Sequence, residues 1–71
     1  MSNKITLRAA RVNAGLTQSK AAKEIGVTRD TLSNWENGKS APSVLKFKDI
    51  ERVYGIAYDN LDFLPQNTRN A

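Results

Sequence analysis

Between residues 18 and 35, apolar and small side chains recur at intervals of three and four, the spacing of a buried helix face. The positions that follow this spacing are Ala21, Ala22, Ile25, Leu32 and Trp35. Gly26 interrupts the series, and a glycine adopts the positive φ of a tight turn without steric cost. The pattern therefore predicts two short helices that cross through a turn, which is the form of a helix-turn-helix.

Hydroxyl side chains precede both segments and predict where the helices begin. Thr17 and Thr28 are each able to cap a helix, because a hydroxyl oxygen accepts a free backbone N–H of the first turn. Asn37 and Gly38 predict the end of the second helix. The outward face of that helix then carries Thr28, Arg29, Asp30, Ser33 and Asn34.

Two further helices are expected on either side of this unit. Residues 6–14 predict a first helix whose inward candidates are Leu7, Ala10 and Val12. Residues 43–54 predict a fourth helix, which Ser43 is able to cap. Its apolar positions recur at spacings of three and four and comprise Val44, Phe47, Ile50 and either Val53 or Tyr54.

Residues 58–64 predict a last helical turn or two, which Pro65 prevents from continuing. The 71-residue chain contains no cysteine, so helix packing alone must stabilise a core of this small size. We expect one compact, all-α domain of five helices over residues 1–64. Residues 65–71 form a polar tail that has nothing to bury, and we expect it to be disordered.

Charge is distributed unevenly along this chain, whose formal net charge is +4. Residues 1–39 hold seven basic and three acidic side chains, whereas residues 40–71 hold four of each. The surplus therefore lies in the half that contains the helix-turn-helix pattern, as a phosphate-binding surface requires. The solvated surface of a small basic protein would give the same count, so charge alone leaves both interpretations open.

Composition argues against several other function classes. The chain has no histidine, no cysteine, no nucleotide-binding loop and no carboxylate pair in a recognisable site. We therefore expect no enzyme, no metal site and no cofactor. No apolar run approaches membrane-spanning length or has the form of a signal peptide, so we expect a cytoplasmic protein with no membrane partner.

From residue 16 to residue 43, the sequence LTQSKAAKEIGVTRDTLSNWENGKSAPS resembles the helix-turn-helix of the lambda-repressor-like DNA-binding family, which includes the Cro and XRE types. The shared features are Thr17-Gln18, Ala22, Gly26-Val27, Trp35-Glu36-Asn37-Gly38 and Pro42. The resemblance extends over about residues 5–64. It departs at Ala21, where Leu or Val is usual, and at Ala57, where Ser or Thr commonly caps the last helix. We expect Trp35 to fill the space beside Ala21.

The resemblance implies a sequence-specific regulator of transcription that binds double-stranded DNA, a phage-type or bacterial repressor. Its second motif helix, the third helix of the domain, would enter the major groove. The implied base contacts are Thr28, Arg29, Asp30, Ser33 and Asn34. By base chemistry Arg29 matches guanine and Asn34 matches adenine, while Asp30 either accepts from cytosine or orients Arg29. The implied phosphate contacts are Thr17, Gln18, Lys20, Asn37, Lys39 and Ser40, and Arg8 and Lys23 are weaker candidates chosen for charge.

Two further residue pairs also follow from the resemblance. Arg11 and Glu36 match positions that form a partly buried ion pair. Tyr58 and Leu64 are candidate dimer contacts, although residues at this end of the chain are equally suited to completing the core. Dimers of this family place two reading helices about 34 Å apart on a palindromic site.

The implied partners are therefore a palindromic double-stranded operator, a second copy in a weak homodimer or a dimer formed on DNA, and RNA polymerase. The alternative is a protein-interaction module on the same fold, such as an antitoxin or an adaptor. That function predicts an uncharged reading face and an exposed apolar patch. RNA binding ranks lower, because the sequence offers no paired aromatic platform for stacking bases.

Overall fold

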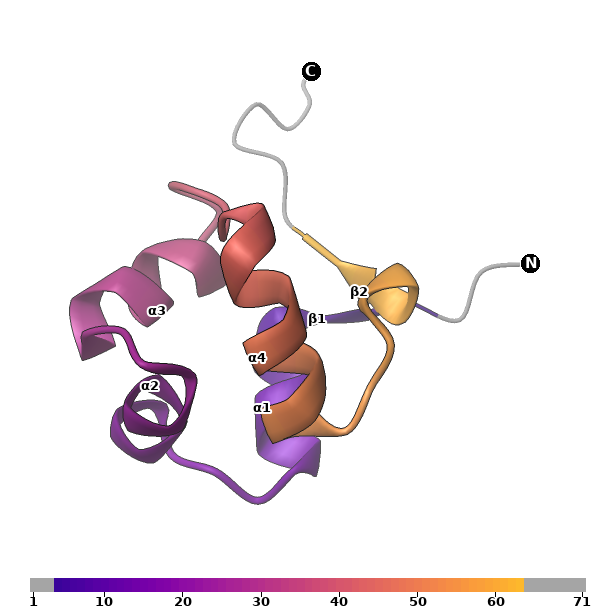
Figure 1. Cartoon of the computed structure of the whole chain (residues 1–71), viewed down its shortest axis with the longest axis horizontal. Helices are drawn as coiled ribbons and strands as arrows, with labels where there is room; N and C mark the ends of the chain where they lie inside the picture. Colours follow the sequence, from indigo (N-terminus) through magenta and orange to yellow (C-terminus); the bar gives the residue numbers. More distant parts are fainter. Residues whose placement is uncertain (1–3, 64–71) are drawn as a thin grey trace.

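The computed structural model describes residues 4–63, and within this range the chain forms four α-helices and a short pairing of its two ends (Figure 1). The helices are α1 (Leu7–Asn13), α2 (Gln18–Ile25), α3 (Arg29–Glu36) and α4 (Val44–Tyr54). A 3-10 turn, η1 (Tyr58–Asn60), follows α4. Two strands, β1 (Ile5–Thr6) and β2 (Leu61–Asp62), pair in parallel with Ile5 opposite Leu61.

The predicted count of five helices was wrong. Of the last helix expected over residues 58–64, the described residues contain only the single turn η1, after which Leu61 is extended and pairs with β1. Ala57 precedes this turn and has no side-chain group to cap it. The cap comes from α4 instead, because Glu51 Oε2 accepts a hydrogen bond from Tyr58 N at 2.7 Å. The expected tail at residues 65–71 lies outside the described residues.

Side-chain caps begin three of the helices. Thr17 Oγ1 accepts from Lys20 N and Thr28 Oγ1 accepts from Thr31 N, both at 3.1 Å, which confirms the predicted starts of α2 and α3. Thr6 Oγ1 accepts from Ala9 N at 3.0 Å, so Thr6 caps α1 and is not its first residue. Ser43 stands at the start of α4, but its side chain makes no capping hydrogen bond.

The core lies where α2 packs against α3 and α4, with α1 and Leu61 of β2 completing it. Its buried residues are Leu7, Ala10, Ala21, Ala22, Ile25, Leu32, Trp35, Ile50, Tyr54 and Leu61. Ala21 has no exposed surface and belongs to the same cluster as Trp35, so its small side chain opens no gap to solvent. Small residues at positions 21 and 22 let the neighbouring helices pack close to α2.

Two residues predicted to face inward lie on the surface. Val12 is 60% exposed, because it stands two residues from Ala10 and therefore about 200° around the helix from it. Val44 is 74% exposed, and its neighbour Leu45 is 84% exposed. Both lie in the first turn of α4, whereas the buried positions of that helix are Ile50 and Tyr54. Helical spacing defines a face, but it does not reveal how far the neighbouring helices extend along that face.

Candidate nucleic-acid interface

Helix α3 buries one face and exposes the other. Leu32, Trp35 and Glu36 point inward, because apolar spacing and the charge pairing of Glu36 hold this side against α1 and α2. Arg29, Asp30 and Asn34 are exposed. Figure 1 shows α3 at the edge of the molecule, on the opposite side from β1 and β2. The outward face of α3 is therefore accessible to a large partner.

The exposed polar residues of α3 are not engaged within the domain. Among residues 4–63, the side chains of Arg29, Asp30 and Asn34 make no hydrogen bond or ion pair. Arg29 and Asp30 do not pair with each other either, so nothing in this part of the chain supports an orienting role for Asp30. Arg29 offers only hydrogen-bond donors, Asp30 offers only acceptors, and Asn34 offers both.

The other two predicted base contacts, Thr28 and Ser33, already have partners. Thr28 Oγ1 accepts from Thr31 N and donates to Thr31 Oγ1 at 2.9 Å. Ser33 Oγ accepts from Asn37 Nδ2 at 3.3 Å. Because these hydroxyls are partly used, they have less hydrogen-bonding capacity left for a base than Arg29 or Asn34.

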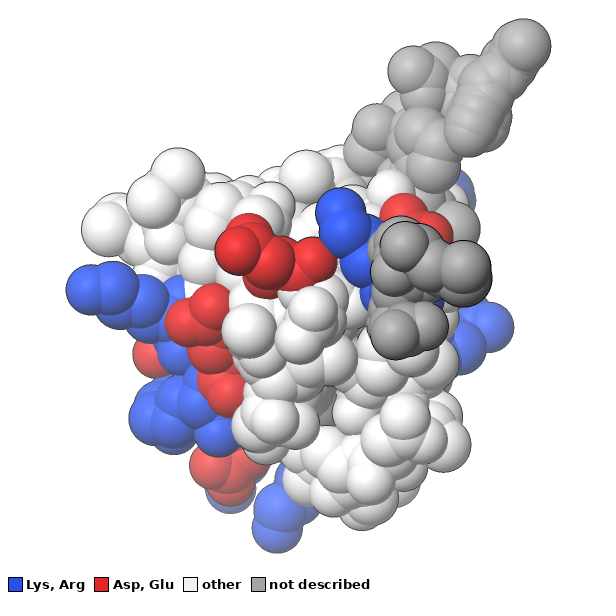
Figure 2. Space-filling model, turned by 90° about the vertical axis from the view of Figure 1, so that its right-hand side faces the viewer, with Lys and Arg blue, Asp and Glu red and all other residues white. Residues whose placement is uncertain are grey.

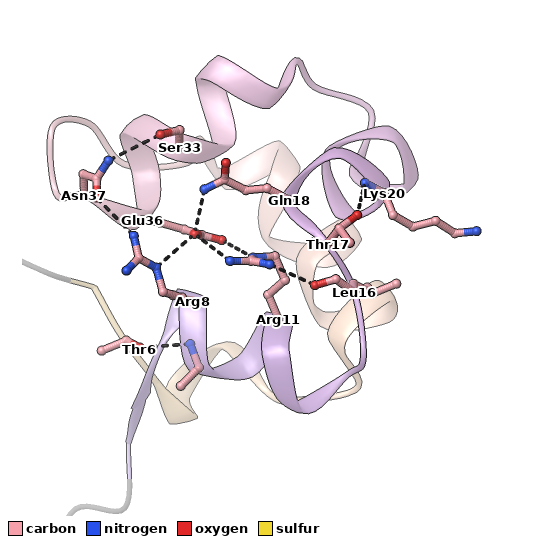
Figure 3. Close-up of polar contacts among 11 residues, drawn as sticks. Thr6, Arg8, Arg11, Leu16, Thr17, Gln18, Lys20, Ser33, Glu36 and Asn37 are labelled. Atoms are coloured by element: carbon pink, nitrogen blue, oxygen red, sulfur yellow. Dashed lines mark hydrogen bonds and ion pairs between the residues drawn. The ribbon is translucent and has the colours of Figure 1, made fainter.

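A buried carboxylate organises the polar residues behind α3 (Figure 3). The Glu36 side chain has no exposed surface, and Arg11 Nε donates to its Oε2 at 2.7 Å. Gln18 Nε2 donates to Oε1 at 3.0 Å, and Arg8 Nε lies 3.5 Å from the same oxygen. We call these four residues the Glu36 cluster. It joins α1, α2 and α3, and it contains the expected ion pair between Arg11 and Glu36.

Arg8 connects the Glu36 cluster to the surface. Its side chain is 57% exposed, and its Nη2 donates to Asn37 Oδ1 at 3.4 Å. Asn37 in turn donates to Ser33 on α3. A chain of polar contacts therefore runs from the buried carboxylate to the outward face of α3, as Figure 3 shows. The sequence marked Arg8 only by its charge, although its spacing of three from Arg11 places both on one face of α1.

The remaining predicted phosphate contacts lie at the start of α2 and in the loop after α3. Thr17 caps α2, Lys20 is exposed in its first turn, and Lys39 and Ser40 are exposed beyond Asn37. Within residues 4–63, neither lysine has an acidic partner. Free N–H groups and partial positive charge at a helix start favour an anion. The surface around α2 and α3 therefore has the chemistry of a phosphate-binding surface.

The opposite side of the molecule differs in character. Figure 2 shows this side, where basic and acidic side chains are interspersed and a broad area carries no charge. The candidate dimer contact Tyr58 is half-buried and stacks on Phe47, with ring centroids 3.8 Å apart, and it also contacts Phe63. Leu64, the other candidate, lies outside the described residues.

One buried polar group is unsatisfied. Tyr54 Oη is buried, and no described residue gives it a hydrogen bond. Its pKa is raised from 10.0 to about 12, chiefly by burial, with the charge of Glu36 adding to the shift and Arg11 opposing it. Tyr54 also lines an open pocket of about 230 Å³, together with Ile5, Ala10, Asn13, Gly55 and Ile56. Over residues 4–63, no group of three or more acidic side chains is placed to hold a metal ion, and no helix is long and apolar enough to cross a membrane.

Comparison with known proteins shows the family. The helix-turn-helix family matches residues 7–61, which include all four helices. The chain belongs to the lambda-repressor-like helix-turn-helix family. No solved structure matches this member of the family.

Three curated relatives of this lambda-repressor-like domain are HTH-type regulators. The transcriptional activator BcrR of Enterococcus faecalis is 33% identical over 55 residues, which are 78% of this chain and 27% of that protein. An uncharacterized regulator of Archaeoglobus fulgidus is 36% identical over 55 residues, which are 78% of this chain and 79% of the relative. An uncharacterized regulator of Methanothermobacter thermautotrophicus is 39% identical over 49 residues, which are 69% of this chain and 71% of the relative. The chain thus spans about a quarter of BcrR and most of the other two.

Proposed function

We propose that this protein is a sequence-specific regulator of transcription that binds double-stranded DNA with α3 in the major groove. The observation that carries the proposal is the outward face of α3, where Arg29, Asp30 and Asn34 are exposed and unpaired within residues 4–63. A major groove presents a different set of donors and acceptors for each base pair. To distinguish base pairs, a protein needs side chains that are free to form hydrogen bonds with these donors and acceptors.

Each of the three side chains matches a different base. Arg29 has donors only, and its planar fork fits O6 and N7 of guanine. Asn34 has a donor and an acceptor, and these fit N7 and N6 of adenine. Asp30 has acceptors only, so it fits the N4 donor of cytosine. Asp30 and Asn34 lie one helical turn apart on α3 and would read neighbouring base pairs.

Phosphate contacts from the start of α2 and the loop after α3 would fix the register of this helix on the duplex. The residues in this role are Thr17, Gln18, Lys20, Asn37, Lys39 and Ser40.

We further propose that two copies pair on a palindromic operator and act as a repressor of the phage or bacterial kind, by excluding RNA polymerase from the site. The relative BcrR is named an activator. A reporter gene placed behind the operator therefore tests the direction, and we expect its expression to fall.

A second candidate function is a protein-interaction module. The observation that favours it is the exposed apolar pair Val44 and Leu45 at the start of α4. The charged face of α3 favours DNA instead. Leu45 and Arg29 lie on different helices, so Leu45→Ser and Arg29→Ala distinguish the functions. If DNA is the partner, Arg29→Ala impairs function and Leu45→Ser does not.

Selection of bound duplexes from a random DNA pool tests the main proposal. We expect a palindromic consensus that contains guanine and adenine at separate positions of each half-site. The double variant Arg29→Ala/Asn34→Ala should lose this consensus, and the control Lys48→Ala, which removes an exposed lysine of α4, should keep it. Recovery of sequences no different from the starting pool would refute the proposed function.

A further inference from the structure

We propose that the open pocket between the ends of α1 and α4 binds a small primary amine, with its ammonium group at the helix ends and its alkyl chain among apolar side chains. Figure 1 shows both helices ending in the lower part of the view. The inference does not depend on DNA binding, because no residue of α2 or α3 lines the pocket. The lining residues come from β1, α1 and the end of α4 and are Ile5, Ala10, Asn13, Tyr54, Gly55 and Ile56.

The pocket has the size and the lining for a short alkyl chain. Its volume is about 230 Å³, which is smaller than the sites of about 300–1,000 Å³ that hold drug-sized ligands. Ile5, Ala10 and Ile56 contribute apolar side chains to it. A ligand of a few carbon atoms therefore removes apolar surface from water when it binds. Water is the competing occupant, and it would leave this apolar surface hydrated.

The end of α4 supplies hydrogen-bond acceptors that have no partner in the part of the chain that the structure describes. Gly55 N donates to Glu51 O at 2.8 Å, but none of residues 4–63 donates to the carbonyls of residues 52–54. The last carbonyls of a helix point beyond its end, and Gly55 and Ile56 line the pocket there. Donors of a ligand in the pocket therefore have acceptors to bind.

The charge at these helix ends favours a cation. Arg11, in the last turn of α1, donates to Glu36 instead of to the end of its own helix. Arg52, in the last turn of α4, donates to Glu24 O at the end of α2, where Lys46 also lies. The ends of α1 and α4 each carry a partial negative charge, and both line one pocket.

Asn13 adds a side-chain acceptor. It is the last residue of α1, it is exposed, and its side chain makes no hydrogen bond within residues 4–63. An ammonium group has three donors and no acceptor, so it matches the Asn13 amide oxygen together with free carbonyls. A carboxylate has acceptors only, and its negative charge is unfavourable at two helix ends.

Binding of n-butylamine to the whole chain tests the proposal, with backbone amide shifts followed by NMR at constant ionic strength. We expect the shifts to concentrate at Ala10, Asn13, Gly55 and Ile56. The control n-butanol has the same number of non-hydrogen atoms and no charge, and we expect it to bind roughly tenfold more weakly. Butyrate should not bind. Equal binding of the amine and the alcohol, or amine shifts spread over the whole surface, would overturn the proposal.

Asn13→Lys places a tethered ammonium group at the helix ends, so we expect it to abolish the binding of n-butylamine. Val12→Lys is the matched control, because it adds the same charge to the same turn of α1 at a position that is 60% exposed and does not line the pocket. It should change the affinity by no more than about twofold, since salt screens exposed charges. Equal losses in the two lysine variants would mean that general repulsion acts and would refute the site.

A lysine side chain ends in the same alkylammonium group as n-butylamine. Nα-acetyl-lysine amide is therefore a further probe, and we expect it to bind more weakly, because a pocket of about 230 Å³ does not enclose its two amide groups. Tighter binding of this probe than of n-butylamine would assign the pocket to a lysine of a protein partner and overturn its assignment to a free amine.

Discussion

Glu36 shows, at the scale of a single residue, how one buried charge is made tolerable. Its carboxylate accepts from Arg11 and Gln18, on α1 and α2, and its side chain has no exposed surface. Desolvation offsets much of the attraction in such a pair, so the pair by itself is a weak source of stability. Removal of Arg11 is different, because it leaves the buried carboxylate with only the amide of Gln18 and the longer contact from Arg8.

Arg11→Ala therefore tests the ion pair. We expect the free energy of unfolding to fall by about 3–5 kcal/mol, the usual cost of breaking a buried pair. Arg11 also donates to Leu16 O at 2.9 Å, a contact that the variant would lose. Urea unfolding measures the change, with Lys48→Ala as the surface control, for which a change within about 0.5 kcal/mol is expected. An unaltered melting temperature in Arg11→Ala would contradict this account of the Glu36 cluster.

Tyr54 makes stability depend on alkaline pH. The folded state raises the pKa of its hydroxyl from 10.0 to about 12, so the folded chain holds this proton more tightly than the unfolded chain. The free energy of unfolding should stay constant up to about pH 10 and then fall until about pH 12, by up to ~1.4 kcal/mol per pH unit. Thermal unfolding between pH 8 and about pH 12 measures this fall.

Tyr54→Phe is the matched variant. It removes a buried hydroxyl that has no described partner, so we expect stability at neutral pH to be unchanged or raised by up to ~1 kcal/mol. The alkaline fall should become shallower. A variant as sensitive to alkali as the wild type would show that another group titrates.

Arg29→Ala tests the proposed base reading at a single residue. Arg29→Ala should weaken binding to the selected operator by roughly 1–3 kcal/mol and relax the preference at one base pair, because the fork that distinguishes guanine is lost. Titration of fluorescent duplexes measures both effects. Equal losses on the operator and on random DNA would mean that Arg29 contacts phosphate instead.

Helix α2 and its turn into α3 show, at the scale of an element, how residues of α4 hold the end of α2. Gly26 has a φ of +94°, and a Cβ there would lie 3.3 Å from Lys46 Nζ. Lys46 Nζ itself lies 3.5 Å from Ile25 O, while Arg52 Nη2 lies 3.4 Å from Glu24 O. Two cations of α4 therefore satisfy the last carbonyls of α2, where the helix dipole favours positive charge.

Gly26→Ala and Gly15→Ala separate backbone strain from this contact. Gly15 has a φ of +77°, and a Cβ there would meet nothing within 4 Å, so its variant carries the strain alone. We expect about 1–2 kcal/mol of destabilisation for Gly15→Ala and more for Gly26→Ala, which also displaces Lys46. Equal losses in chemical denaturation would show that the Lys46 contact contributes nothing.

The elements also show what the sequence could and could not predict. The starts of α2 and α3 follow from Thr17 and Thr28, because a cap and its helix are neighbours in the chain. The end of the fold does not, since η1 is capped by Glu51 from another element and β2 is fixed by its pairing with β1. Contacts between distant segments leave no local pattern.

The candidate site also has some features that the sequence predicts and others that it does not. Helical spacing places Arg29, Asp30 and Asn34 outward, and the structure has them there. The link from Arg8 through Asn37 to Ser33 depends on how α1 meets the end of α3, which no periodicity reveals. The sequence therefore identified the exposed face of α3 but not the contacts that lie behind it.

At the scale of the whole molecule, exposed cations lie around α2 and α3. The side in Figure 2 mixes both signs, whereas Lys20, Arg29 and Lys39 are exposed on α2, on α3 and in the loop that follows α3. Such an arrangement draws a polyanion to one side of the protein. Binding should therefore weaken with salt on every sequence, in addition to any base preference.

Lys39→Ala tests this nonspecific part. We expect it to weaken binding to all duplexes alike and to reduce the salt slope by about one, because a single phosphate contact is lost. Lys48→Ala, which removes an exposed lysine of α4, is the control and should change neither quantity. A loss restricted to the operator would place Lys39 among the base-reading residues.

The pairing of β1 with β2 has a consequence for the way this domain could be joined to others. Ile5 lies opposite Leu61, so the described chain leaves the fold where it entered, on the opposite side of the molecule from α3 (Figure 1). Adjacent ends allow a domain to be inserted into a surface loop of a host protein, or to be circularly permuted, without a long connector. Joining the ends and opening the chain in the exposed turn around Gly15 should therefore leave α3 presented as before.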